Sequence, residues 1–185
     1  MKLTVLVFFL ALLIPRTHAE TPRQFGERFY RAYFRWDIRG APNTPERHMI
    51  SAYFGTEVLH LFSAVERQRV REHQGFLRKH RNEPNPPQVK PIWSKEGDPF
   101  SSVYEGISTF AIGRPEIRNG RITVPAHLEY LSDGRVHSWT DVLVLDRAGE
   151  SWVVADIRFR DGKTLVFGLR AGIAESEPYL QSYPK

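Results

Sequence analysis

The sequence predicts an α+β domain in which N-terminal helices pack on a curved antiparallel sheet of about four strands. Apolar residues recur at helical spacing between residues 21 and 80, whereas apolar and polar residues alternate between 108 and 159. Asn-Gly and Asp-Gly pairs separate alternating segments, and such pairs favour two-residue hairpin turns. Neither half can bury its apolar face alone, so we expect one domain over 20–173, followed by a polar, loosely held tail over 174–185.

Residues 1–19 have the layout of a secretory signal peptide. Lys2 gives a positive start, residues 3–14 form an apolar run, and Ala19 is the small residue that a signal peptidase needs. The run is shorter than the ~20 apolar residues with which a helix crosses a bilayer. We therefore expect cleavage after Ala19 and a periplasmic or secreted chain that does not span a membrane.

The composition narrows the classes of partner and cofactor. The 185 residues carry a net charge of +5, and loss of Lys2 and Arg16 with the leader leaves 24 basic against 21 acidic residues. This excess is too small to predict nucleic-acid binding and only weakly favours an anionic partner. The absence of cysteine excludes a lipid anchor, disulfides and thiolate metal sites. No phosphate-binding loop, nucleophile elbow, zinc motif or calcium loop is present, so neither a cofactor nor a metal is predicted.

The first predicted helix begins at a capping signal. Thr21 suits the N-cap, Pro22 suits the first helical position, and Gln24 can complete a capping box. Its apolar face contains Phe25, Phe29, Ala32, Tyr33 and Trp36. A turn is predicted over 40–43.

Thr44 and Pro45 repeat the start signal and predict a short second helix that ends at Gly55. A third helix is predicted over about 56–80. Its inward residues are expected to be Leu59, Phe62, Val65, Val70, Phe76 and Leu77. Residues 82–99 contain five prolines and therefore predict a loop or an extended connector.

The second half predicts a four-stranded meander. The alternating segments are 108–118, 121–131, 136–146 and 151–159. Within the first, a bulge is expected over 113–115, because the apolar residues before and after it are out of phase. A two-residue turn at Asp133 and Gly134 sets a register in which Ala126 faces Asp141, Leu128 faces Trp139 and Tyr130 faces His137.

The last hairpin has two candidate registers. One pairs Leu145 with Trp152 and Leu143 with Val154, which places Asp141 opposite Asp156. The other is shifted by one residue, and then Val153, Ala155 and Ile157 face inward and Asp156 turns outward. The loop between the strands leaves both open.

Three segments carry a resemblance to a known fold family. They are Gly-Asp-Pro-Phe-Ser-Ser-Val-Tyr-Glu-Gly over 97–106, Trp-Thr-Asp-Val-Leu-Val-Leu over 139–145, and Trp-Val-Val-Ala-Asp-Ile over 152–157. Together with helices that precede a curved sheet, they resemble the NTF2-like (cystatin-related cone) superfamily. More narrowly, they are similar to a family of bacterial exported proteins and predicted lipoproteins without an established activity.

The resemblance covers about 25–168 and implies an NTF2-like cone. The chain departs from the lipoprotein members because it lacks the anchor cysteine, so a soluble form is expected. The superfamily includes isomerases, dehydratases and non-catalytic binding domains, and the fold alone does not select among them.

The sharpest candidate for chemistry is the carboxylate pair Asp141 and Asp156. Two neighbouring carboxylates on a partly buried face would raise one pKa and supply an acid and a base. His137 and Tyr130 could complete a proton-transfer group. In the structural alternative, Asp141 accepts a hydrogen bond from an indole N–H of Trp139 or Trp152, or from a loop amide, and orders the sheet.

Two further groups carry weaker signals. Phe29 and Tyr33, with Tyr130 and Trp139, could line a pocket for an apolar ligand, but such an aromatic stripe is more often plain core. His127 and Glu129 alternate on the face expected to be exposed, and their spacing matches no known metal-ligand set.

An Arg-rich segment lies on the third predicted helix. Arg67, Arg71 and Arg78 could contact an anionic surface, and the alternative is a solvated helix face. Taken together, these patterns favour a non-catalytic binding protein for a small apolar ligand or a protein partner, in the manner of an immunity protein. The alternative is a small enzyme that uses Asp141 with Asp156 or His137 for general acid–base catalysis.

Overall fold

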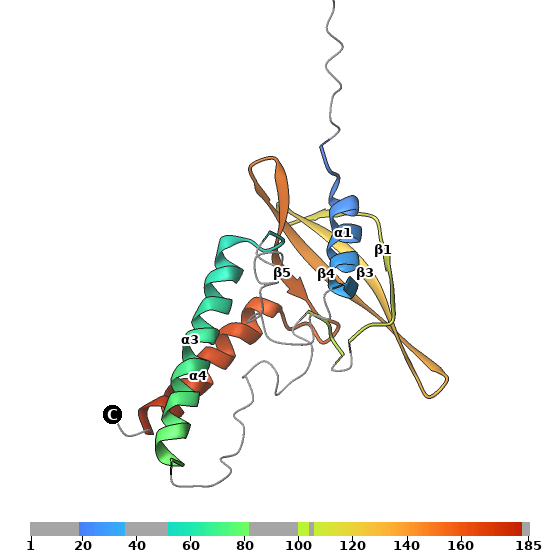
Figure 1. Ribbon diagram of the computed structural model, residues 1–185. Coiled ribbons are helices and arrows are strands. Elements are labelled where there is room, and N and C mark those ends of the chain that lie inside the picture. The colour runs from blue at the N-terminus through green and yellow to red at the C-terminus, as the bar shows by residue number, and fades with distance from the viewer. Residues whose placement is uncertain (1–18, 36–51, 82–99, 104–105, 183–185) are drawn as a thin grey trace, which may run out of the picture.

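The computed structural model describes residues 19–35, 52–81, 100–103 and 106–182. Within these residues the fold is α+β, with three helices and a curved antiparallel sheet of five strands (Figure 1). The elements are α1 (Pro22–Arg35), α3 (Thr56–Lys79), β1 (Thr109–Ile112), β2 (Glu116–Arg118), β3 (Arg121–Ser132), β4 (Arg135–Ala148), β5 (Ser151–Arg158) and α4 (Leu165–Ser182). The sheet order is β1-β3-β4-β5, and β2 also pairs with β3.

Helix α1 begins at the predicted capping box. The Thr21 backbone N–H donates to Gln24 Oε1 at 2.9 Å, and the Gln24 N–H donates to Thr21 Oγ1 at 3.3 Å. The helix lies across one face of the sheet, the inner face, and approaches it closely at Gly26 (Figure 1). A Cβ at this position would lie 3.3 Å from Ile112 Cγ2 and 3.4 Å from Val124 Cγ1.

The β3–β4 register is confirmed along its whole length. Ala126 faces Asp141, Leu128 faces Trp139 and Tyr130 faces His137. The turn uses positive φ at both Asp133 (49°) and Gly134 (72°), as a type I′ turn requires. Because side chains alternate between faces, this turn directs Asp141 to the inner face.

The interruption predicted in the first strand is also confirmed. Residues 113–115 separate β1 from β2, and both strands pair with β3. The Gly113 N–H still donates to the Pro125 carbonyl at 2.8 Å, so β3 stays continuous beside the interruption. The turn at Asn119 (φ 52°) and Gly120 (φ 75°) repeats the type I′ geometry.

Neither register expected for the last hairpin holds along its whole length, and only the inward Ile157 and the outward Asp156 of the shifted register are confirmed. Strand β4 continues to Ala148, so the turn is shorter than expected, and Leu145 pairs with Val154. An irregularity then admits Ala155 as an extra residue, so that Val144 pairs with Asp156. As a result Trp152, Val154 and Ile157 are the buried residues of β5, and Asp156 does not face Asp141.

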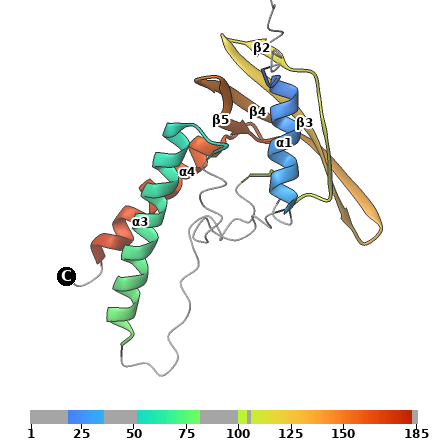
Figure 2. The same ribbon diagram turned by 45° about the horizontal axis from the view of Figure 1, so that its top comes forward.

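The C-terminal segment differs most from the prediction. Residues 165–182 form α4, so 174–182 continue a helix instead of forming a loose tail. Helix α4 lies beside α3, and the two helices extend away from the sheet as one arm (Figures 1 and 2). The Gln68 side-chain amide joins them by donating to the Ile173 carbonyl at 3.0 Å.

Helix α3 matches its predicted range, but not all of its predicted inward residues are buried. Phe62 and Val65 lie in the core, whereas Val70 is 44% exposed and Leu77 is 43% exposed. These two residues belong to the half of α3 that leaves the sheet, where α4 covers only one face. The helix predicted to begin at Thr44 and the connector over 82–99 lie outside the described residues, apart from Tyr53 and its neighbours.

The core fills the space between α1, the first turns of α3 and the inner face of the sheet. Its aromatic members are Phe25, Phe29, Tyr30, Tyr33, Tyr53, Phe54, Phe62, Phe100, Trp139 and Trp152. In the part of the chain that the structure describes, no helix has the length and apolar character needed to cross a membrane.

Candidate functional site

Asp141 is the most deeply buried carboxylate among the described residues. The confirmed register places it on the inner face of β4, where its side chain has no solvent exposure. The Ser102 backbone N–H donates to Oδ2 at 3.0 Å, and the Trp139 indole N–H donates to the same oxygen at 3.1 Å. The Ser102 hydroxyl donates to Oδ1.

These bonds join three separate segments of the chain. Ser102 lies in the segment before β1, and its hydroxyl oxygen also accepts a hydrogen bond from the Arg160 N–H at 2.9 Å. Arg160 follows β5, so Asp141 and Ser102 connect the centre of the sheet to two segments outside it. We call Ser102, Trp139, Asp141 and Arg160 the Asp141 cluster.

Burial and hydrogen bonding act in opposite directions on Asp141. Removal from water disfavours the charged form and raises the pKa of Asp141 above its ordinary value, while the hydrogen bonds from Ser102 and Trp139 and the nearby Arg160 backbone N–H lower it. Burial is the larger effect, so the net shift is upward. A raised pKa also occurs in catalytic acids, so the surroundings must decide between catalysis and structure.

Asp156 does not complete a carboxylate pair with Asp141. Its Oδ1 accepts from the Ile157 N–H at 2.8 Å and from the Val166 N–H at 3.0 Å. Val166 belongs to the first turn of α4, where backbone N–H groups lack helical partners. Asp156 therefore holds the start of α4 next to β5, together with Thr164, whose Oγ1 accepts from the Phe167 N–H at 3.2 Å.

The other proposed acid–base residues are also placed apart from Asp141. His137 is exposed on β4, and Tyr130, which faces it across the ladder, is half-buried at the edge of the core. Both lie nearer the β3–β4 turn than Asp141 does. Of the four residues in the acid–base hypothesis, only Asp141 is buried.

The expected pocket residues pack against other aromatic rings. Phe29 lies 5.1 Å from Tyr30 and 5.7 Å from Phe54, measured between ring centroids. Tyr33 contacts Tyr30 at 6.3 Å, and Trp139 donates to Asp141. These contacts match the alternative in which the stripe is core.

His127 and Glu129, the pair expected on the exposed face of β3, do not belong to a metal-ligand group within the described residues. The His127 Nδ1 lies 2.9 Å from Thr140 Oγ1, in a hydrogen bond on the face opposite the core. Across the described ranges, no three histidine, aspartate or glutamate side chains come together as a ligand group. Glu129 faces Ser138 on the neighbouring strand.

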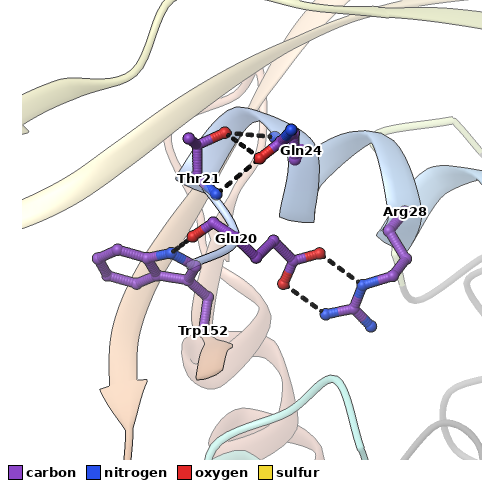
Figure 3. A network of polar contacts seen from close by, with 5 residues as sticks. All are labelled: Glu20, Thr21, Gln24, Arg28 and Trp152. Carbon is purple, nitrogen blue, oxygen red and sulfur yellow. Dashed lines mark hydrogen bonds and ion pairs between the residues drawn. The ribbon is translucent and has the colours of Figure 1, made fainter. Parts of the chain in front are cut away.

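A second polar network fixes the start of α1, and its contacts between Glu20, Arg28 and Trp152 were not predicted from the sequence (Figure 3). The Glu20 carboxylate accepts two hydrogen bonds from Arg28, at 2.7 and 2.8 Å, which raises the pKa of the guanidinium. The Trp152 indole N–H donates to the Glu20 carbonyl at 2.8 Å. The network therefore fastens the residue after the expected cleavage site to β5.

The Arg-rich segment occupies the arm. Arg67, Arg71 and Arg78 are all exposed on α3, and within the described residues none of the three forms an ion pair. Their helical spacing places them on one side of the helix. The segment is thus a surface feature separate from the Asp141 cluster.

Comparison with protein-family models, with curated proteins and with solved structures returns no match for this chain.

Proposed function

We propose that this chain is an exported, non-catalytic binding protein with an NTF2-like fold. The support for the fold is the curved antiparallel sheet with α1 across its inner face, together with the sequence resemblance over 25–168. The support for export is the signal-peptide layout of residues 1–19. Glu20, the residue after the expected cleavage site, is bonded to Arg28 and Trp152, which supports a mature chain that starts there.

The single observation that carries the non-catalytic assignment is the bonding of Asp141. The Ser102 N–H, the Ser102 hydroxyl and the Trp139 indole N–H all donate to its carboxylate. The other residues of the acid–base hypothesis lie elsewhere. A general acid or base needs a path to a substrate proton at hydrogen-bond distance. An inward carboxylate sealed by an indole, an amide and a hydroxyl instead satisfies buried donors and fixes the positions of three segments.

The raised pKa of Asp141 is the one observation that favours the enzyme alternative. It follows from burial, however, and burial acts on a structural carboxylate in the same way. Asp156 accepts a hydrogen bond from the start of α4, and His137 is exposed. Neither residue is therefore a second catalytic group beside Asp141. We therefore assign binding to the surface of the molecule and not to its interior.

Native mass spectrometry of the chain purified without denaturation tests this assignment. We expect the mass of the bare chain for the wild type, for Asp141→Asn and for the exposed control Asp146→Asn. A small molecule bound at equal stoichiometry in the wild type and in Asp146→Asn, but absent from Asp141→Asn, would point to an interior site and contradict the proposal.

N-terminal sequencing of the exported form tests localisation, with Glu20 expected as the first residue.

A further inference from the structure

The outer side of α3 carries basic residues in a straight line. With 3.6 residues per turn, positions 60, 67, 71, 74 and 78 fall within about 60° of one another around the helix. The residues at these positions are His60, Arg67, Arg71, Gln74 and Arg78, all exposed. They extend over about 27 Å at 1.5 Å per residue. We call these five residues the basic stripe.

The three acidic residues of α3 lie outside the basic stripe, and only Glu57 stands at the i, i+3 or i, i+4 spacing of a helical side-chain pair from a member of it, His60. Glu57 pairs with Arg170 of α4, Glu66 lies 3.6 Å from Arg69, and Glu72 is buried. On α4, Glu175 and Glu177 are exposed but belong to the helix on the other side of the arm. The charge of the stripe is therefore not neutralised by the helix that carries it.

Apolar side chains flank the basic stripe. Val70 and Leu77 are about half exposed and lie on one side of it, roughly a quarter-turn around the helix. Apolar residues next to basic ones on an exposed helix are typical of helices that lie at a membrane surface, where the apolar groups enter the boundary of the acyl chains.

From this arrangement we propose that the basic stripe of α3 docks the protein on an anionic phospholipid surface. The proposal names the partner of the binding protein proposed above and rests on that function. Side chains in one line along a straight helix can touch a plane at the same time, and a bilayer with anionic headgroups is a negatively charged plane. Because the arm extends away from the sheet, α3 can approach that plane while the sheet stays clear of it (Figure 2).

Vesicle flotation tests the proposal with the chain from Glu20 to Lys185, since the apolar leader would itself enter a bilayer. We expect the protein to float with vesicles of phosphatidylglycerol and phosphatidylcholine, and not with phosphatidylcholine alone. Binding should weaken steeply as salt rises through physiological strength, where the Debye length is about 8 Å. Replacement of Arg67, Arg71 and Arg78 by Gln should reduce partitioning about a hundredfold, at about fivefold per residue.

A matched variant separates the stripe from net charge. Arg121, Arg135 and Arg158 are exposed on the sheet, and their replacement by Gln removes the same charge. We expect this control to bind like the wild type, with circular dichroism to verify that both variants fold. Equal losses in the two variants, or no flotation of the wild type, would overturn the proposal.

The double substitution Val70→Ser and Leu77→Ser distinguishes a membrane from an acidic macromolecule. On a membrane it should weaken vesicle binding several-fold while the salt dependence stays the same. Unchanged vesicle binding, with equally strong binding to soluble polyglutamate, would overturn the membrane assignment. Such results would leave the non-catalytic function intact, because that function fails only on a ligand that depends on Asp141.

Discussion

The Asp141 cluster and the α3–α4 arm differ in how completely their buried polar side chains are hydrogen-bonded. In the cluster, a fully buried carboxylate accepts three hydrogen bonds and joins three segments. In the arm, Gln68 is also buried and its amide donates to α4, but its Oε1 has no partner among the described residues. The comparison indicates that the sheet side of the molecule is built for a unique structure, whereas the arm tolerates imperfect packing and presents a surface.

The largest effect is expected from removal of the Asp141 carboxylate. Asp141→Ala leaves two N–H donors and a hydroxyl without their acceptor in the core, at about 1–3 kcal/mol for each unpaired group. We expect the free energy of unfolding in urea to fall by about 3 kcal/mol. Asp146→Ala, on the exposed face of the same strand, should change it by less than about 0.5 kcal/mol. Similar losses in both variants would remove the distinction.

Gly26 in α1 and Gly168 in α4 offer a matched pair of substitutions. Gly26→Val places methyl groups against Ile112 and Val124, and overpacking of this kind typically costs about 1–3 kcal/mol. Gly168→Val in α4 meets nothing within 4 Å of its Cβ and should gain about 0.3 kcal/mol from helix propensity. Thermal unfolding measures both effects. A larger loss of stability for Gly168→Val than for Gly26→Val would contradict the prediction that the arm is the more tolerant region.

The pH dependence of stability tests the cause of the Asp141 pKa shift. Folding raises the pKa of Asp141, so the folded state binds the proton more tightly than the unfolded state. The resulting stabilisation is complete below the ordinary aspartate pKa of about 3.9 and is lost as pH rises through the folded value. Asn cannot titrate, so the stability of the wild type relative to Asp141→Asn should fall from about pH 4 towards neutrality. The opposite slope would mean that the hydrogen bonds outweigh burial.

The smallest effect is expected in the seam between α3 and α4. Gln68→Met removes a buried oxygen without a partner and keeps a similar volume, while the Ile173 carbonyl still accepts from Ser176 at 3.1 Å. We expect unfolding in urea to show unchanged stability or a gain of up to about 1 kcal/mol. A loss of more than about 2 kcal/mol would show that the arm depends on this residue as the sheet depends on Asp141.

Local signals predicted the parts of the fold that local geometry controls. The Thr21 capping box and the Asp133–Gly134 turn each act over a few residues, and the turn alone set the inward direction of Asp141. The structural alternative for Asp141 named an indole of Trp139 or Trp152, or a loop amide, as donor, and the observed donors include the Trp139 indole and the Ser102 amide. The extra residue Ala155 carries no such local signal, and it turns Asp156 away from Asp141, its partner in one of the two expected registers.

Long-range contacts decided what the sequence did not reveal. Helix α4 contains Gly168, Gly172 and Pro178, which normally argue against a helix, and its stability comes from packing on α3. Ser102 lies 39 residues before Asp141, and no spacing rule joins a loop serine to a strand carboxylate at that separation. The Glu20 network was missed for the same reason, because its indole donor lies 132 residues away.

The sequence separation of these contacts also has a kinetic consequence. Ser102 is separated by 39 residues from Asp141 and by 58 residues from Arg160. Closing chain segments of this length costs conformational entropy, which is recovered only when further contacts form. We therefore expect the β3–β4 hairpin, with its two-residue turn, to form before the Asp141 cluster closes. A contact absent from the folding transition state changes the unfolding rate and leaves the folding rate almost unaltered. The Asp141 cluster would then lengthen the lifetime of the folded protein mainly by slowing unfolding.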